Sequence, residues 1–125
     1  MQTDRQAGTV IFVSDRSPEA TVLQDIEAYG LVMQWARSIR AAVDLLNSAR
    51  EKTVIVTELA LADGNWRDLI ERMRGIDICV PIVLVTSFST AELWWDALEC
   101  GIVDILPGHL IASRLCQLLK TQGAS

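Results

Sequence analysis

The sequence lacks the long apolar run and the positive charge that would assign it to a membrane or to nucleic acid. No apolar stretch approaches the ~20 residues that a membrane helix needs. Residues 1–8 are polar and carry no apolar core of a signal peptide. Lys and Arg number 11 against 16 Asp and Glu, and no basic stripe offsets this balance. We therefore expect a cytoplasmic domain that binds neither membranes nor nucleic acid.

Metal-binding and redox side chains are also scarce. Cys79, Cys100 and Cys116 are widely spaced in apolar sequence, which predicts buried free thiols rather than disulfides or a metal site. The single histidine, His109, stands at a predicted helix start, where we expect a structural role. The sequence has no glycine-rich phosphate loop and no C-x-x-C pair, so nucleotide, dinucleotide and thioredoxin-like chemistry lack their motifs.

What the sequence does have is a regular alternation of short apolar strands and amphipathic helices. Half of its 125 residues are hydrophobic, which suits one α/β domain whose sheet is covered on both faces. Strands are expected at 9–13, 31–35, 53–58, 82–86 and 102–106, each followed by a helix, the last at about 109–120. Short connections between such units predict parallel strands. Residues 1–8 are expected to be a flexible lead-in, 9–120 the domain, and 121–125 a tail or trimmed linker.

Two helices carry signals that the structure can test. Ser17 followed by Pro18 predicts the N-cap and first residue of the first helix, and Gly30 predicts its end. In the fourth helix, expected at about 89–100, Trp94 falls on the stripe predicted to face the core, and Trp95 falls on the opposite side. That predicted core stripe consists of Leu93, Trp94, Ala97 and Leu98.

Polar residues gather where the predicted strands end. Because the carboxyl ends of parallel strands share one edge, Ser14 and Asp15 from the first strand should meet Glu58 from the third and Thr86 from the fourth. Open α/β sheets bind their ligands at this edge. Glu58 is therefore the first candidate for a functional carboxylate.

These residues, in this order, resemble the receiver domain of response regulators, the CheY-like, flavodoxin-like phosphoacceptor module of two-component signalling. The resemblance covers about residues 9–120 and implies an α/β fold with a doubly wound five-stranded parallel sheet in the order 2-1-3-4-5, with two helices on one face and three on the other. The matching segments are Val13-Ser14-Asp15, Thr57-Glu58-Leu59-Ala60-Leu61, Leu84-Val85-Thr86-Ser87, and Ala97-Leu98-Glu99-Cys100-Gly101 with Asp104-Ile105-Leu106.

The resemblance also implies roles for single positions. In the family, two acids after the first strand help to hold Mg²⁺, an aspartate after the third accepts a phosphoryl group, a hydroxyl after the fourth binds it, and a lysine before a proline neutralises it. Here Asp15 matches the second acid and Thr86 the hydroxyl. The departures are Ser14 for the first acid, Glu58 for the phosphoacceptor, Gly108 for the lysine, His109 for the proline, and Ile105 for the switch aromatic on the fifth strand.

These departures predict a pseudo-receiver, a signalling domain and not an enzyme. Glutamate reaches roughly 1.5 Å farther than aspartate, and a 1 Å misplacement can cost transfer chemistry about 100-fold. Losing the lysine at position 108 removes a fixed charge aimed at the transferred group. Asp15 and Glu58 alone would allow at most weak Mg²⁺ binding, so no cofactor is required. A Gly108–His109 bond should be trans, which would reshape the loop after the fifth strand.

Several alternatives stay open at this point. Glu58 either mimics the phosphorylated aspartate or is an inert remnant, and Asp15 is either a residual metal ligand or a loop acid near a helix start. A working receiver that binds Mg²⁺ and is modified by an unusual route, for instance on Glu58, is the first alternative function. A flavodoxin-like domain that binds a small molecule in the same crevice is the second.

The expected mode of action is protein–protein contact in a bacterial-type phosphorelay. Trp95, Leu110 and Leu118 form the candidate interface, because an exposed tryptophan is a plausible anchor and the last helix has a broad apolar face. Receiver-like domains commonly dimerise or dock through the fourth helix, fifth strand and fifth helix. The partner would be a histidine kinase, an output domain or a second copy, and Trp95 alone is equally compatible with having no role.

Overall fold

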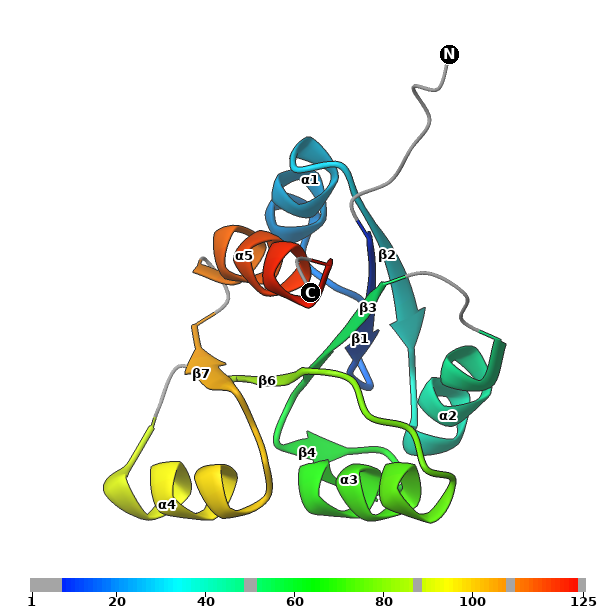
Figure 1. The fold of residues 1–125 in the computed structure, drawn as a ribbon, viewed down its shortest axis with the longest axis vertical. Coiled ribbons are helices and arrows are strands. Elements are labelled where there is room, and N and C mark those ends of the chain that lie inside the picture. The colour runs from blue at the N-terminus through cyan, green and yellow to red at the C-terminus, as the bar shows by residue number, and fades with distance from the viewer. Residues whose placement is uncertain (1–7, 49–51, 87–88, 108–109, 124–125) are drawn as a thin grey trace.

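The protein is built on one parallel sheet. The computed structural model describes residues 8–48, 52–86, 89–107 and 110–123. Its five main strands are β1 (Gly8–Val13), β2 (Leu31–Ala36), β3 (Thr53–Thr57), β6 (Ile82–Val85) and β7 (Asp104–Leu106). They pair in parallel in the order β2-β1-β3-β6-β7 (Figure 1), which confirms the predicted fold class and strand order.

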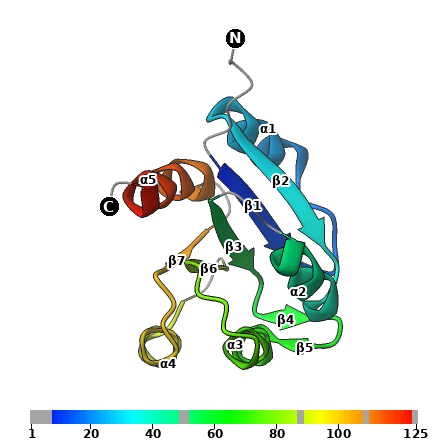
Figure 2. The ribbon, with the colours of Figure 1, turned by 45° about the vertical axis from the view of Figure 1, so that its right-hand side comes forward.

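Helices cover both faces of this sheet. They are α1 (Ala20–Ala28), α2 (Ile39–Ser48), α3 (Trp66–Gly75), α4 (Ala91–Glu99) and α5 (Ile111–Gly123). One apolar cluster joins the sheet to α2, α3 and α4, and a second joins it to α1 and α5. Figures 1 and 2 show α3 and α4 side by side, on the far side of the sheet from α1 and α5. The predicted division into three helices and two is therefore confirmed.

The central strands are buried because both of their faces meet helices. Every residue of β1 and β3 is buried, and β-branched residues dominate both strands. Their alternate side chains feed the two clusters: Ile11 and Ile55 pack toward α2 and α3, whereas Val10 and Val54 pack toward α1 and α5. In α3, apolar residues recur at helical spacing, which predicts a buried stripe, and its members Trp66, Leu69, Ile70 and Met73 are all buried.

The first helix begins later than predicted. Its N-cap is Glu19, which has an extended backbone and makes no side-chain capping bond, so Ser17 is not the cap. A residue before proline avoids the helical region, which keeps Ser17 extended, and the first helical hydrogen bond runs from the Leu23 N–H to the Glu19 carbonyl. Residues 15–19 instead form a loop along the edge of the sheet. The predicted end is confirmed, since Gly30 adopts φ +81° after the last turn.

The fourth helix is rotated relative to the prediction. Trp94 was expected in the core but is exposed, and only Ala97 of α4 is fully buried. The inward stripe is Leu93, Asp96, Ala97 and Cys100. In this orientation the Arg67 guanidinium of α3 pairs with the Asp96 carboxylate. Two apolar residues predicted to face the core, Trp94 and Leu98, therefore lie on the surface.

A short hairpin follows β3 where only a loop was predicted. It consists of β4 (Ala60–Leu61) and β5 (Gly64–Asn65), paired antiparallel. At its tip, the Asp63 carboxylate accepts hydrogen bonds from the N–H groups of Ile39 and Arg40 at 2.8 and 3.3 Å, which caps α2 from a distance in sequence. Asn65 and Asp68 form a reciprocal capping box at the start of α3. The hairpin thus fixes the beginnings of two helices.

Three smaller expectations concern thiols, membranes and the last loop. All three cysteines are free, as predicted, but Cys79 is exposed rather than buried, because it lies in the irregular segment before β6, outside the two clusters. Within the described ranges, no helix is long and apolar enough to cross a membrane. The predicted trans bond between Gly108 and His109 lies outside the described residues.

Candidate functional site

Two parallel strands bring Ser14 and Glu58 together. In the register of β1 and β3, Val13 lies opposite Thr57, so the next residues, Ser14 and Glu58, leave the sheet side by side. The backbone N–H of Glu58 still bonds to the Val13 carbonyl at 3.2 Å, and that of Ser14 to the Ala36 carbonyl at 3.0 Å. These bonds extend the sheet by one residue on each strand and fix the start of both side chains.

The two side chains form a direct hydrogen bond. The hydroxyl of Ser14 donates to Oε1 of Glu58 at 2.8 Å. Ser14 is only 1% exposed, whereas Glu58 is half-buried. A hydrogen bond to an ionised carboxylate is stronger than one between neutral groups. Glu58 is thus anchored to the end of β1 and does not simply extend into solvent.

Every polar group of Ser14 has a partner. Its hydroxyl oxygen also accepts a hydrogen bond from the Arg16 N–H at 3.1 Å, and its carbonyl accepts one from Nε1 of Trp35 at 2.9 Å. Buried polar groups need such partners to offset the loss of water. Sequence reasoning missed Trp35. Its signal was a tryptophan near the end of the second strand, where its indole N–H can reach the loop after the first.

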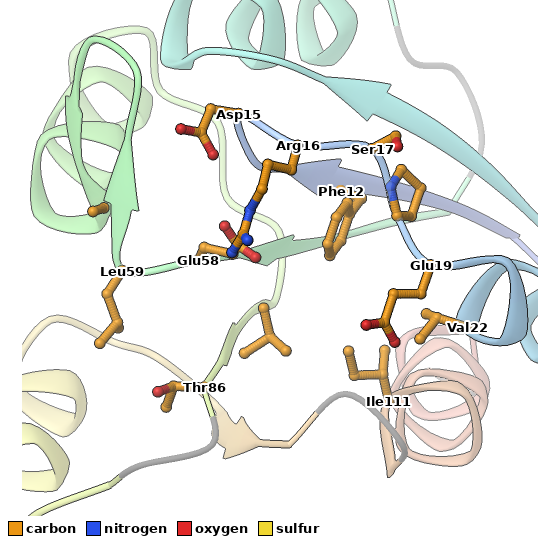
Figure 3. A pocket seen from close by; sticks show the side chains of 13 residues that line it. Phe12, Asp15, Arg16, Ser17, Glu19, Val22, Glu58, Leu59, Thr86 and Ile111 are labelled. Atoms are coloured by element: carbon orange, nitrogen blue, oxygen red, sulfur yellow. The ribbon is translucent and has the colours of Figure 1, made fainter.

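A crevice of about 900 Å³ opens at this edge of the sheet. Figure 3 shows its polar part, with Asp15 and Arg16 above Glu58 and with Thr86 on the other side of Glu58. The apolar part of the lining is made by Phe12, Val22, Leu59, Val85 and Ile111. The structure therefore places three of the predicted site residues, Asp15, Glu58 and Thr86, in one lining, as expected for the carboxyl edge of the sheet.

One cation faces this acidic crevice. Of the described residues that line it, Arg16 alone is a Lys or Arg, and Figure 3 shows its side chain extending from the loop after β1 toward Glu58. Sequence reasoning gave Arg16 no role, because only the neighbouring acids matched the receiver pattern. Its position partly offsets the negative charge of Asp15, Glu19 and Glu58.

The donor set does not suit a divalent cation of the Mg²⁺ type. Such an ion prefers six oxygens in near-octahedral geometry. The crevice is lined by the carboxylates of Asp15, Glu19 and Glu58, which are not grouped to hold one ion, and Oε1 of Glu58 already accepts the Ser14 hydrogen bond. Among the described residues, no group of three or more His, Cys, Asp or Glu side chains is placed to hold a metal.

The other positions of the receiver pattern lie as follows. Thr86 follows β6, and its N–H bonds to the Leu106 carbonyl at 3.0 Å. Ile105 is buried in the cluster that joins the sheet to α2, α3 and α4. Ser87, Gly108 and His109 lie outside the described residues. An isoleucine in this place fills the core, and it has no ring that could turn between an inward and an outward position.

The candidate interface is partly exposed. Trp95 is 69% exposed on α4, and Leu110 is 46% exposed just before α5. Leu118 is half-buried and packs against the cluster beneath α1 and α5, so it offers less free surface. Trp94, Leu98 and Val103 add exposed apolar area that was not predicted. The exposed residues Trp94, Trp95 and Leu98, which lie on one side of α4, are called the α4 patch below.

No protein-family model matches the chain. Several curated proteins are similar to it in sequence. The transcriptional regulatory protein ZraR of Salmonella typhimurium is 25% identical over 116 residues, which cover 89% of this chain and 25% of ZraR. The photosynthetic apparatus regulatory protein RegA of Cereibacter sphaeroides is 27% identical over 118 residues, covering 94% of this chain and 64% of RegA. The chain thus spans about a quarter of one relative and less than two thirds of the other.

Solved structures share the fold. The receiver domain of the Francisella response regulator 1452 superposes with a TM-score of 0.79 at 20% identity and covers 91% of this chain and 98% of that domain. At this identity the likeness establishes the fold. The chain therefore has the fold of a CheY-like response-regulator receiver domain, with the strand order β2-β1-β3-β6-β7, and is similar in sequence to ZraR and RegA over nearly its whole length.

Proposed function

We propose that this domain is an atypical receiver, which takes part in a two-component pathway through protein contact and without normal aspartyl phosphorylation. The observation that carries the proposal is the hydrogen bond between the Ser14 hydroxyl and the Glu58 carboxylate. These two residues occupy positions at which the receiver pattern has an acid that helps to hold Mg²⁺ and an aspartate that accepts the phosphoryl group.

The paired departure supports this proposal on electrostatic grounds. Two neighbouring carboxylates repel each other, and a bound cation relieves that repulsion. A hydroxyl beside a carboxylate needs no cation, because it satisfies the carboxylate as a donor. Ser14 and Glu58 therefore satisfy each other as hydrogen-bond donor and acceptor without a cation. The serine at position 14 and the glutamate at position 58 are compatible for this reason.

Phosphoryl transfer to Glu58 is disfavoured for two further reasons. The side chain is longer than that of aspartate and is held toward β1 by the 2.8 Å bond from Ser14 to one of its two oxygens, which displaces the carboxylate from the position of the receiver aspartate. Arg16, the cation that lines the crevice, comes from the loop after β1, whereas the receiver lysine comes from the loop after the last strand. In this proposal the Glu58 carboxylate is anchored by Ser14 and has a structural role. It is then neither a free mimic of the phosphorylated aspartate nor an inert remnant surrounded by solvent.

The α4 patch supports contact with a partner. Its members, Trp94, Trp95 and Leu98, lie on one side of the same helix, and Trp95 is its most exposed tryptophan. Tryptophans of this kind often anchor interfaces. The proposed partner is a histidine kinase, an output domain or a second copy of the chain, and the proposed setting is the cytoplasm. Since ZraR is about four times as long as the match, an output domain in the same protein is part of the proposal.

The proposal is tested with a small-molecule phosphoryl donor. The protein is incubated with Mg²⁺ and acetyl phosphate, and intact mass is followed over time. We expect no phospho-adduct on the native chain. A Ser14→Asp/Glu58→Asp/Gly108→Lys variant, which restores the receiver pattern, serves as the comparison and should gain a labile adduct. A stable adduct on the native chain, mapped to Glu58, would overturn the proposal and favour an unusual phosphorylation route.

A second candidate function is favoured by the apolar lining of the crevice. Phe12, Val22, Val85 and Ile111 line it together with the polar groups, and its volume of about 900 Å³ is within the range of small-molecule sites. The chain would then bind a ligand with an apolar body. Native mass spectrometry of freshly purified protein distinguishes the two candidate functions. A co-purified molecule in stoichiometric amount is expected only if the domain binds a small molecule.

A further inference from the structure

The side chain of Trp35 contacts the backbone of Ser14. Its indole Nε1–H donates a 2.9 Å hydrogen bond to the Ser14 carbonyl, 21 residues away in the sequence. The same serine carries the hydroxyl that holds Glu58. A line of contacts therefore runs from the edge strand β2, through the loop after β1, to the carboxylate after β3.

Packing fixes the indole from two sides. In the sheet register, Phe12 of β1 lies beside Trp35 of β2, and Phe12 is both buried and part of the crevice lining. The guanidinium of Arg37 lies 5.0 Å from the centre of the indole ring, a cation–π distance. Trp35 is nevertheless 37% exposed, so burial alone does not determine the orientation of its ring. Its hydrogen bond gives it a defined orientation.

We propose that Trp35 is a positioning residue, which holds the Ser14 peptide in the orientation that directs the Ser14 hydroxyl at Glu58. The physical reason is that Ser14 is nearly fully buried, so its carbonyl needs a donor. Without the indole N–H, the peptide that follows Ser14 gains by rotating its carbonyl toward water. That rotation moves the Arg16 N–H away from the Ser14 hydroxyl oxygen, because the two groups belong to the same short loop.

The meaning of this role for signalling rests on the proposed function. If the Ser14–Glu58 pair takes the place of the metal and phosphate chemistry, then a partner that touches Trp35 or Arg37 on the edge strand would act on that pair directly. The coupling between the indole N–H of Trp35 and the hydrogen bonds of Ser14 does not depend on that proposed function.

The test is amide hydrogen exchange measured by NMR on the native chain and on the Trp35→Phe variant. Phenylalanine keeps an aromatic ring beneath Arg37 but has no N–H. We expect exchange at the Arg16 amide to accelerate about fivefold relative to the core amide of Val54, the factor that corresponds to a hydrogen bond of ~1 kcal/mol. The side-chain carboxyl ¹³C resonance of Glu58 should shift at the same time. Trp95→Phe, an exposed tryptophan on α4, is the matched control and should change neither signal.

A Ser14→Ala background separates positioning from general loss of stability. Without the hydroxyl, the Arg16 amide should exchange fast already, and adding Trp35→Phe should produce no further local change. The proposal is overturned if Trp35→Phe accelerates Arg16 and Val54 equally, or if its effect on Arg16 persists unchanged in the Ser14→Ala background. A phospho-adduct on the native chain would refute the proposed function, but it would leave this exchange result standing.

Discussion

The Ser14 hydroxyl and Oε1 of Glu58 lie 2.8 Å apart, although 44 positions separate the two residues in the sequence. The parallel register of β1 and β3 causes this meeting, because it places the residues that follow Val13 and Thr57 next to each other. In the receiver pattern both positions are acidic. Here one hydroxyl and one longer carboxylate occupy them and form a hydrogen-bonded pair.

Removing the Ser14 hydroxyl should destabilise the fold. Ser14→Ala leaves the Glu58 carboxylate and the Arg16 N–H without their partner. Because Glu58 is half-buried and water can partly replace the hydroxyl, we expect a loss of about 1 kcal/mol in the free energy of unfolding. Urea denaturation measures this loss. Ser17→Ala, at an exposed serine of the same loop, is the control and should cost nearly nothing. Equal effects of the two substitutions would show that the bond does not contribute.

The hairpin after β3 should depend on Gly64. A Cβ added there would lie 2.5 Å from Oδ2 of Asp68 and 3.0 Å from Cδ1 of Ile39, at a φ of +153° that disfavours other residues. Asp68 completes the capping box of α3, so its displacement would also weaken that helix start. We expect Gly64→Ala to lower the free energy of unfolding by about 1–2 kcal/mol.

Gly75 provides the matched comparison for that substitution. It lies at the end of α3, and a Cβ added there would meet nothing within 4 Å. Gly75→Ala should be neutral or stabilising by up to about 1 kcal/mol, because alanine favours the helix. Thermal and urea unfolding of both variants give the comparison. A Gly64→Ala variant as stable as the native chain would contradict the described hairpin geometry.

Asp63 should give the stability of the domain a specific dependence on acid pH. Partial burial on its own raises the pKa of the Asp63 carboxyl, but hydrogen bonds from the N–H groups of Ile39 and Arg40 outweigh it and hold the pKa below its ordinary value. A carboxyl whose pKa is lowered by folding stabilises the protein fully above its unfolded pKa of about 3.9. The contribution is lost as the pH falls through the folded pKa.

Asp63→Asn should therefore cost only about 0.3–0.5 kcal/mol at neutral pH, because the amide has one acceptor oxygen for two N–H groups and no charge, and solvent screens this exposed side chain. The difference from the native chain should shrink as the pH falls below about 4. Urea unfolding at several pH values measures it. Asp44→Asn, on the exposed face of α2, is the control and should show no such convergence. A native-to-variant difference that stays constant into strong acid would refute the role given to this carboxylate.

The parts of the fold that follow from local periodicity were predictable. The buried stripe of α3 and the end of α1 at Gly30 can each be predicted from residues close together in the sequence, and both are confirmed. The strand order needed the resemblance to receivers as well, and the structure agrees with it. At the site, the gathering of Asp15, Glu58 and Thr86 follows from the parallel sheet, because strand ends share one edge.

What the sequence did not reveal depends on contacts between distant segments. The rotation of α4, which exposes Trp94, depends on how this helix packs against the sheet and on its neighbour α3, where Asp96 meets Arg67. The roles of Asp63 and Trp35 arise in the same way, since each bonds to the backbone more than 20 residues away. Periodicity contains no information on such bonds, because each depends on how two elements are placed relative to one another.

The central claim is that the Ser14–Glu58 pair replaces a cation site. The most direct measurement is an NMR titration of Mg²⁺ into the native chain and into the Ser14→Asp/Glu58→Asp variant, following the amides of Asp15, Arg16 and Glu58. The account predicts that the variant shows saturable shifts at these amides and that the native chain shows none at the concentration which saturates the variant. Saturable shifts in the native chain, at the same or lower Mg²⁺ concentration, would contradict it.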